Sequence, residues 1–116
     1  MTKGIRGAIT VEANTEAAIK AATVELLTEM IKQNNLTQEK ISHAIFTVTT
    51  DLNAAFPAKF ARLTIGWDKV AMMCLNELDV PNSRRMCLRV LIVVNCDDNF
   101  VPNFVYLKGA KNLRSS

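Results

Sequence analysis

The chain has 116 residues, of which 49% are hydrophobic and 22% charged, and its formal net charge is +3. This size and balance are typical of one globular domain, expected to span residues 1–116, and they argue against a disordered chain. The positive charges are scattered, with Arg84-Arg85 as the longest basic run. A nucleic-acid-binding protein usually carries a basic stripe, so no nucleic-acid partner is expected.

No membrane segment, export signal or metal site is indicated either. Apolar runs such as Val90–Val94 are far shorter than the ~20 residues that a membrane-spanning helix needs. The three cysteines, at positions 74, 87 and 96, lack the paired spacing of a disulfide scaffold or a zinc site. We therefore expect a cytoplasmic protein with no membrane partner.

A strand and a long helix are predicted at the start of the chain. Residues alternate over Gly4–Glu12, which predicts a strand with Ile5 and Ile9 on one face and Arg6 on the other. Residues 14–16 then have the composition of a helix start, and Asn34-Asn35 that of its end. Between them apolar residues recur at spacings of three and four, as in an amphipathic helix. This apolar stripe consists of Ile19, Ala22, Leu26 and Met30.

Five further elements are predicted, after a short helical turn over residues 37–40. Ile41–Thr50 is rich in β-branched and aromatic residues, as strands are. Pro57 fits the first position of a short helix that runs to about Leu63, with Gly66 as its stop. The later strands are expected within Trp67–Leu75, at Met86–Asn95 and at Phe104–Lys108.

The element order β-α-β-α-β-β-β indicates the α+β class. One long and one short helix should pack on one side of a mixed β-sheet. The other side of such a sheet would be apolar and uncovered. We therefore expect copies of the chain to associate through it.

Arg89 is the unusual residue of this pattern. Both faces of Met86–Asn95 are otherwise apolar, which predicts a central, buried strand. A guanidinium there keeps its charge, and an unpaired buried charge is very costly. Arg89 must therefore either form a structural ion pair with an acidic side chain or face a polar cavity, and the pattern leaves both open.

Other polar side chains give weaker signals. Lys59 and Arg62 share a face of the short helix, which could bind an anion or simply be solvated. Cys74 could be a nucleophile, but nothing brings the only histidine near it, so a small buried side chain is the alternative. Glu77 could bind a ligand hydroxyl or pair with an arginine. Tyr106, the only tyrosine, could be a core residue or a ligand contact.

Taken together, these residues resemble a known family. The resemblance is carried by Gly4–Glu12, Asp51–Lys59, Cys87–Val90 and Val105–Leu107, and by Arg62, Gly66-Trp67, Cys74, Glu77, Asp79-Val80 and Leu113-Arg114. The order and the spacing agree nearly from end to end. The set is similar to that of chorismate mutases of the AroH class.

This resemblance implies an assembly and a reaction. The subunits would form a homotrimer, a trimeric pseudo α/β barrel, with three active sites at the subunit interfaces. The reaction would be the rearrangement of chorismate to prephenate, on the route to phenylalanine and tyrosine. No cofactor and no metal are implied, and the only small-molecule partner would be chorismate.

The resemblance also implies roles for single residues. Arg89 would face the ether oxygen of the breaking bond, and Glu77 would hold the ring hydroxyl with help from the backbone at Cys74. Arg6 and Tyr106 would bind the enolpyruvyl carboxylate. The neighbouring subunit would contribute Phe56, Ala58, Lys59 and Arg62. Further positions at the site are Met73, where the family has a smaller polar residue, and Leu113 and Arg114, where the family's tail covers the site.

Two other functions remain to be weighed. A trimeric imine deaminase of the Rid type has a similar architecture and an arginine in an interface site, but its signature segments are not visible here. A trimer that binds small acids without catalysis is the second alternative. For this second alternative, Arg89 would have to be ion-paired and the cleft around it would have to be closed.

Overall fold

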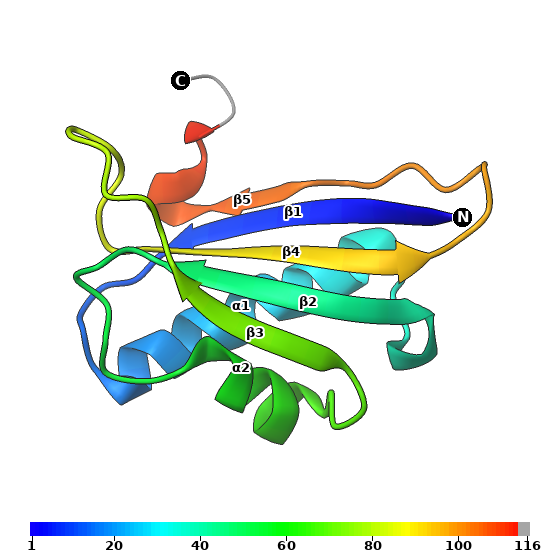
Figure 1. Cartoon of the computed structure of the whole chain (residues 1–116), viewed down its shortest axis with the longest axis horizontal. Coiled ribbons are helices and arrows are strands. Elements are labelled where there is room, and N and C mark those ends of the chain that lie inside the picture. Colours follow the sequence, from blue (N-terminus) through cyan, green and yellow to red (C-terminus); the bar gives the residue numbers. More distant parts are fainter. Residues whose placement is uncertain (114–116) are drawn as a thin grey trace.

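A five-stranded mixed sheet with helices on one face makes up the protein (Figure 1). The structure is a computed structural model that describes residues 1–113. The strands are β1 (Thr2–Thr10), β2 (Ile41–Val48), β3 (Ala71–Asn76), β4 (Cys87–Asn95) and β5 (Val105–Leu107), in the spatial order β3-β2-β4-β1-β5. Strand β4 is antiparallel to both β1 and β2, whereas the outer strands β3 and β5 run parallel to their neighbours. This arrangement confirms the predicted α+β class.

The long helix α1 (Glu16–Asn34) begins and ends where its sequence predicts. Thr15 caps it, because its hydroxyl accepts a hydrogen bond of 3.1 Å from the backbone N–H of Ala18. Asn35 adopts the left-handed conformation that ends many helices. The predicted apolar stripe is buried against the sheet. No helix within residues 1–113 is long and apolar enough to cross a membrane.

The short helix α2 (Pro57–Phe60) starts at Pro57 as predicted but does not end near Leu63. It widens into a π-helical turn, Ala61–Ile65, which is closed by Gly66 in the left-handed conformation. The backbone N–H groups of Gly66 and Trp67 both donate to the carbonyl of Ala61. This wide closure carries the helical segment two residues beyond the predicted end.

The first strand begins and ends two residues earlier than predicted. It pairs with β4 from Thr2, opposite Asn95, to Thr10, opposite Cys87. Met86, the residue before β4, has a positive φ of 49°, so the backbone turns away and the ladder ends there. The alternating pattern of the sequence continues past Thr10, but β1 ends there because Thr10 pairs with Cys87, the first residue of β4.

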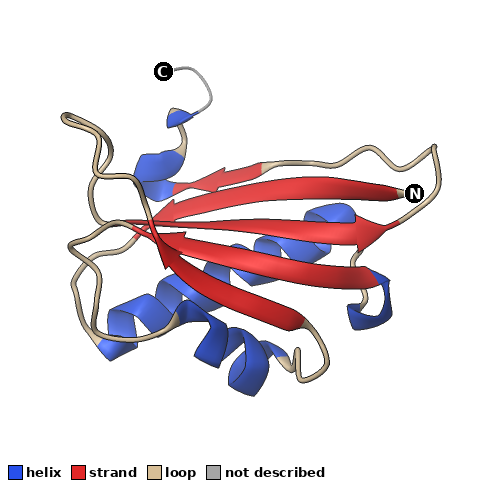
Figure 2. Ribbon diagram, in the orientation of Figure 1, coloured by secondary structure: helices blue, strands red, loops and turns tan. Residues whose placement is uncertain are grey.

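The sheet face toward the helices forms the main core (Figure 2). Leu88, Ile92 and Phe46 are fully buried there under α1. The close approach of α1 depends on Gly7, because a Cβ at that position would lie 2.2 Å from the sulfur of Met30. Gly7 thus lets the helix cover the middle of β1 closely.

The opposite face of the sheet carries no helix among the described residues, as expected, and we call it the open face (Figures 1 and 2). Arg6 and Ala8 of β1 and Arg89 and Leu91 of β4 alternate with the core residues and so lie on this face. Leu91 is 38% exposed although it belongs to the central strand. A single chain therefore leaves apolar surface in the middle of its sheet uncovered.

Asp51 fixes the point at which β4 begins. Its carboxylate accepts hydrogen bonds from the backbone N–H of Met86, at 3.0 and 3.2 Å, and from the hydroxyl of Thr49, at 2.5 Å. Burial works against the ionised form, but these hydrogen bonds and the charge of Arg85 together hold the pKa of Asp51 below its usual value.

Replacing Asp51 by alanine is expected to lower Tm by about 4 °C, the effect of losing about 1 kcal/mol in a domain of this size. A lowered folded-state pKa stabilises the protein above the unfolded-state value of about 3.9 and ceases to do so as the pH falls through the folded-state value. The Tm difference should therefore shrink below pH 4. Thermal unfolding at fixed protein concentration measures it, with Asp68→Ala as the exposed control. An equal effect of both variants at pH 7 would contradict the anchoring role.

Candidate active site

The strand register places four polar or small residues in one row across the open face. Ala8 of β1 lies opposite Arg89 of β4 on one side and beside Tyr106 of β5 on the other. Arg89 in turn lies opposite Thr47 of β2. Arg6 lies two residues before Ala8, in the neighbouring row. The sheet thus brings Arg6, Arg89 and Tyr106 together, as the sequence resemblance implied.

A cavity of about 330 Å³ lies over this row. Its lining combines cationic, anionic and hydroxyl groups with apolar strand residues. It is lined by Arg6, Gly7, Ala8, Ile45, Thr47, Glu77, Arg89, Val90, Leu91 and Tyr106. This volume is at the lower end of the range for small-molecule sites in proteins.

Arg89 is ion-paired and also lines the cavity. Both of the environments that the sequence left open for it, an ion pair and a polar cavity, are therefore present. Its Nε lies 3.5 Å from a carboxylate oxygen of Glu77, and its side chain is 30% exposed. Within residues 1–113 this Nε is buried and donates no hydrogen bond. Charge compensation by Glu77 makes a permanent cation tolerable in the central strand, while the guanidinium remains able to bind a ligand.

Glu77 is held in place from two sides. Its backbone N–H donates to the carbonyl of Val48 at 2.8 Å, just beyond the end of β3. The same carboxylate oxygen that faces Arg89 accepts a short hydrogen bond from the hydroxyl of Thr47. Thr47 is not among the site residues predicted from the sequence, although the alternation of its strand places it on the same face as Ile45.

The hydroxyl of Tyr106 is buried and has no hydrogen-bond partner within the described residues. Buried hydroxyls in native proteins are almost always satisfied, so an unsatisfied one in a cavity points to a ligand group. Arg6 comes from the adjacent strand and lines the same cavity. The pair therefore offers one cation and one hydrogen-bond donor, a combination that suits a carboxylate.

Cys74 shows no sign of being a nucleophile. Burial raises the pKa of its thiol, and a hydrogen-bonding contact with the backbone of Ala58 opposes this only in part. The only histidine, His43, bonds to Ser42 and lies three residues away from Phe46, the residue of β2 that Cys74 pairs with. Successive side chains of a strand alternate between faces, so His43 and Cys74 project from opposite faces.

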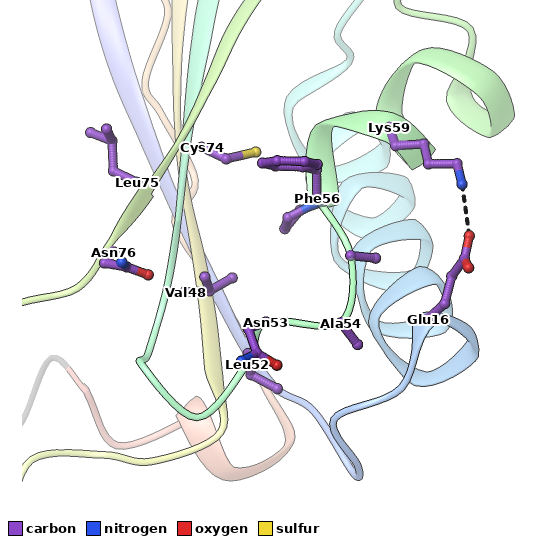
Figure 3. A pocket seen from close by; sticks show the side chains of 12 residues that line it. Glu16, Val48, Leu52, Asn53, Ala54, Phe56, Lys59, Cys74, Leu75 and Asn76 are labelled. Atoms are coloured by element: carbon purple, nitrogen blue, oxygen red, sulfur yellow. Dashed lines mark hydrogen bonds and ion pairs between the residues drawn. The ribbon is translucent and has the colours of Figure 1, made fainter.

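A second group of candidate residues comes from the short helix and β3 and lines another cavity (Figure 3), which shares no lining residue with the cavity of Arg89. This cavity of about 470 Å³ lies between the short helix and β3 and is lined by Phe56, Lys59 and Cys74, among others. Phe56 is 72% exposed, and Lys59 forms an ion pair of 2.7 Å with Glu16. One chain therefore does not bring these residues to the cavity of Arg89.

The remaining predicted residues line neither of these two cavities. Ala58 is half-buried on α2, whereas Arg62 is exposed in the π-helical turn and forms no ion pair within residues 1–113. Met73 is 60% exposed on the open face, in the row of Arg6. Leu113 lines a further cavity next to Arg89, and Arg114 lies outside the described residues. The described residues contain no group of three or more His, Cys, Asp or Glu side chains that could hold a metal ion.

Comparison with known proteins gives one consistent result. The family model for chorismate mutase type I matches residues 2–116. The chorismate mutase AroH of Bacillus subtilis is 40% identical, over 98% of this chain and 91% of its own length. That of Thermus thermophilus is 45% identical, over 98% and 94%. A solved chorismate mutase from Clostridium thermocellum superimposes with a TM-score of 0.89 at 51% identity, covering 94% of this chain and 97% of its own.

Replacing Tyr106 by phenylalanine is expected to leave Tm unchanged or slightly raised, because the hydroxyl that is lost has no partner in the described chain. Thr47→Val is the matched comparison, since it removes a hydroxyl that bonds to Glu77 and should lower Tm. Thermal unfolding of both variants without ligand measures this. Equal destabilisation by the two changes would show that the Tyr106 hydroxyl is already satisfied.

Proposed function

The chain belongs to the chorismate mutase type I family, and from this membership and the geometry of the open-face cavity we infer that it rearranges chorismate to prephenate. It is thus an isomerase of phenylalanine and tyrosine biosynthesis. The observation that carries the mechanism is the guanidinium of Arg89, held by Glu77 at the floor of a cavity that also holds Arg6 and an unsatisfied Tyr106 hydroxyl. The family match does not favour an imine deaminase or a non-catalytic binding trimer.

The reaction needs no nucleophile and no general base, because it is a pericyclic rearrangement within one molecule. One carbon–oxygen bond breaks while one carbon–carbon bond forms, and negative charge develops on the ether oxygen in the transition state. A fixed cation in a site that excludes water stabilises such charge strongly. We assign this role to Arg89. Its planar guanidinium lines the cavity and is paired with Glu77.

The substrate must also be held in a compact conformation in which the two reacting carbons meet. We assign the enolpyruvyl carboxylate to Arg6 and Tyr106, which line the cavity beside Arg89. We assign the ring hydroxyl to Glu77, whose carboxylate still has accepting capacity beyond Thr47. Binding at these points on either side of the ether oxygen favours the reactive conformer and lowers the entropic part of the barrier.

Exposed apolar surface beside the cavity supports a trimer with shared sites. Leu91 and Met73 leave apolar surface on the open face, and a neighbouring copy would cover it. The exposed Phe56 and Arg62, with Ala58 and Lys59, would then be supplied by that copy. They would shape the mouth of the site and attract the dianionic substrate. Met73 and the backbone at Cys74 would border the ring.

The same proposal covers the remaining features of the enzyme. The residues named above supply the cation and the hydrogen bonds of the reaction, so no cofactor is needed. Leu113 would lie at the rim of the site, next to Arg89. We place the reaction in the cytoplasm, and we propose that residues 1–116 form a single catalytic domain.

Arg89→Ala is expected to lower kcat by about 10²–10³-fold, because it removes the cation that faces the developing charge. The measurement is the loss of chorismate absorbance with time, together with the Tm of each protein. Lys20→Ala, which removes an exposed cation on α1, is the control and should leave kcat unchanged. A wild-type rate equal to that of buffer would overturn the function, and full turnover by Arg89→Ala would overturn the mechanism.

Mixing two variants tests the shared site, provided that each alone has lost most of its kcat/KM. If each site takes Arg89 from one subunit and Arg62 from the next, Arg89→Ala and Arg62→Ala proteins unfolded and refolded together should recover about a quarter of wild-type activity, because one interface in four receives both arginines. Each variant refolded alone is the control, and light scattering gives the mass. Absence of recovery in mixed trimers, or an active monomer, would contradict a site built between subunits.

A further inference from the structure

The ion pair between Glu77 and Arg89 passes over the strand that carries Thr47. In the sheet, β2 lies between β3, which Glu77 follows, and β4, which contains Arg89. The register places Thr47 directly opposite Arg89. On the other side of β2, the backbone N–H of Glu77 donates to the carbonyl of Val48 at 2.8 Å. The ion pair therefore spans β2 at the position of Thr47.

The side chain of Thr47 faces this ion pair. Side chains alternate along β2, so Ile45 and Thr47 line the cavity over Arg89, whereas Phe46 between them is buried in the core. Of Ile45 and Thr47, only Thr47 has a hydrogen-bonding side chain. Its hydroxyl donates to Oε1 of Glu77. The strand under the ion pair thus supplies one hydroxyl, and that hydroxyl is bound to the carboxylate.

One oxygen of the Glu77 carboxylate serves two neighbours. Oε1 accepts the hydrogen bond from Thr47, and the same atom lies 3.5 Å from Nε of Arg89. This separation exceeds the ~2.7–3.2 Å of an N–H···O hydrogen bond. Nε accordingly has no hydrogen-bond partner within residues 1–113. The charges of Glu77 and Arg89 attract each other, but no hydrogen bond from Nε closes the pair.

An open ion pair leaves both partners able to bind a ligand. A guanidinium and a carboxylate that meet without other constraints commonly close into two parallel hydrogen bonds. Such closure would engage both oxygens of Glu77 and two N–H groups of Arg89, the groups assigned above to the ring hydroxyl and the ether oxygen. In the described chain, Oε2 of Glu77 instead makes no hydrogen bond or ion pair.

We propose that Thr47 is a positioning residue that keeps the ion pair of Glu77 and Arg89 open. Its hydroxyl occupies Oε1 and holds the carboxylate away from the guanidinium. Oε2 then stays available for the ring hydroxyl, and the N–H groups of Arg89 stay available for the ether oxygen. Thr47 acts through Glu77 and is assigned no contact with the substrate. This inference rests on the proposed function for the roles of Glu77 and Arg89.

Thr47→Val keeps the shape of the side chain but removes the hydroxyl. It is expected to lower kcat about tenfold and to change KM less than about twofold, because a diverted guanidinium stabilises the transition state less well. Thr47→Ser retains the hydroxyl and should retain kcat. Thr23→Val is the matched control, since it removes a buried hydroxyl of α1, bonded to the carbonyl of Ile19 at 2.7 Å. It should leave kcat and KM unchanged, and all assays are run below the lowest Tm.

A double-mutant cycle shows whether Thr47 acts through Glu77. Adding Thr47→Val to Glu77→Ala should change kcat less than about twofold, because no carboxylate is left to position. If Thr47 contacted the substrate directly, the same change would lower kcat by an equal factor in both backgrounds.

Crystal structures of the wild type and of Thr47→Val give a measurement that does not depend on activity. In the variant, the separation between Nε of Arg89 and the nearest oxygen of Glu77 should shrink from 3.5 Å to about 3 Å, the length of a hydrogen bond. Wild-type kcat in Thr47→Val, equal losses in both backgrounds of the cycle, or an unchanged ion pair in the variant would each overturn the proposal. Failure of the proposed function is a different result, in which the wild type itself would not convert chorismate.

Discussion

The structure depends on a single demanding residue, a permanently charged arginine in the middle of its central strand. An arginine cannot shed its proton to escape burial, so the surrounding protein must compensate the charge. Glu77 does so from 3.5 Å, and Thr47 bonds to Glu77 in turn. Glu77 follows β3 and Thr47 lies in β2. The order of the strands in the sheet therefore brings both of these groups next to Arg89.

The same constraint explains why the two faces of the sheet differ. The helix face is closed by a dry core in which Gly7 admits the sulfur of Met30. That close packing gives the strands a firm support. The open face keeps polar groups that are only partly satisfied, including the hydroxyl of Tyr106 and the Nε of Arg89. A rigid sheet beneath incompletely satisfied groups is what electrostatic preorganisation requires, since the site should not relax when charge develops.

The partition of the candidate residues between two cavities is the other consequence of the fold. Arg6, Glu77, Arg89 and Tyr106 meet on the open face, while Phe56 and Lys59 line a cavity between α2 and β3. The ion pair between Lys59 and Glu16 belongs to this second group. The proposed site uses both groups and would therefore require a neighbouring copy to unite them, a proposal that the apolar surface left on the open face supports.

The sequence by itself determined the elements and their type, because hydrophobic period, caps and proline positions act locally. It placed the start of α1 at residues 14–16 and its end at Asn34-Asn35, where Thr15 and Asn35 cap the helix, and it marked Arg89 as a buried charge in a central strand. The resemblance of its motifs to a family added the set of site residues. It misplaced the ends of β1 and α2, because these depend on where β4 turns at Met86 and on a carbonyl of Ala61 that accepts two N–H groups.

Only the tertiary structure decided what Arg89 does with its charge. The sequence pattern allowed either an ion pair or a polar cavity. The strand register provides both, because it places Glu77 and Thr47 beside Arg89 and leaves a cavity over these side chains. Contacts between residues far apart in the chain arise from strand order and register, and no local pattern encodes the distance between two side chains that meet across a sheet.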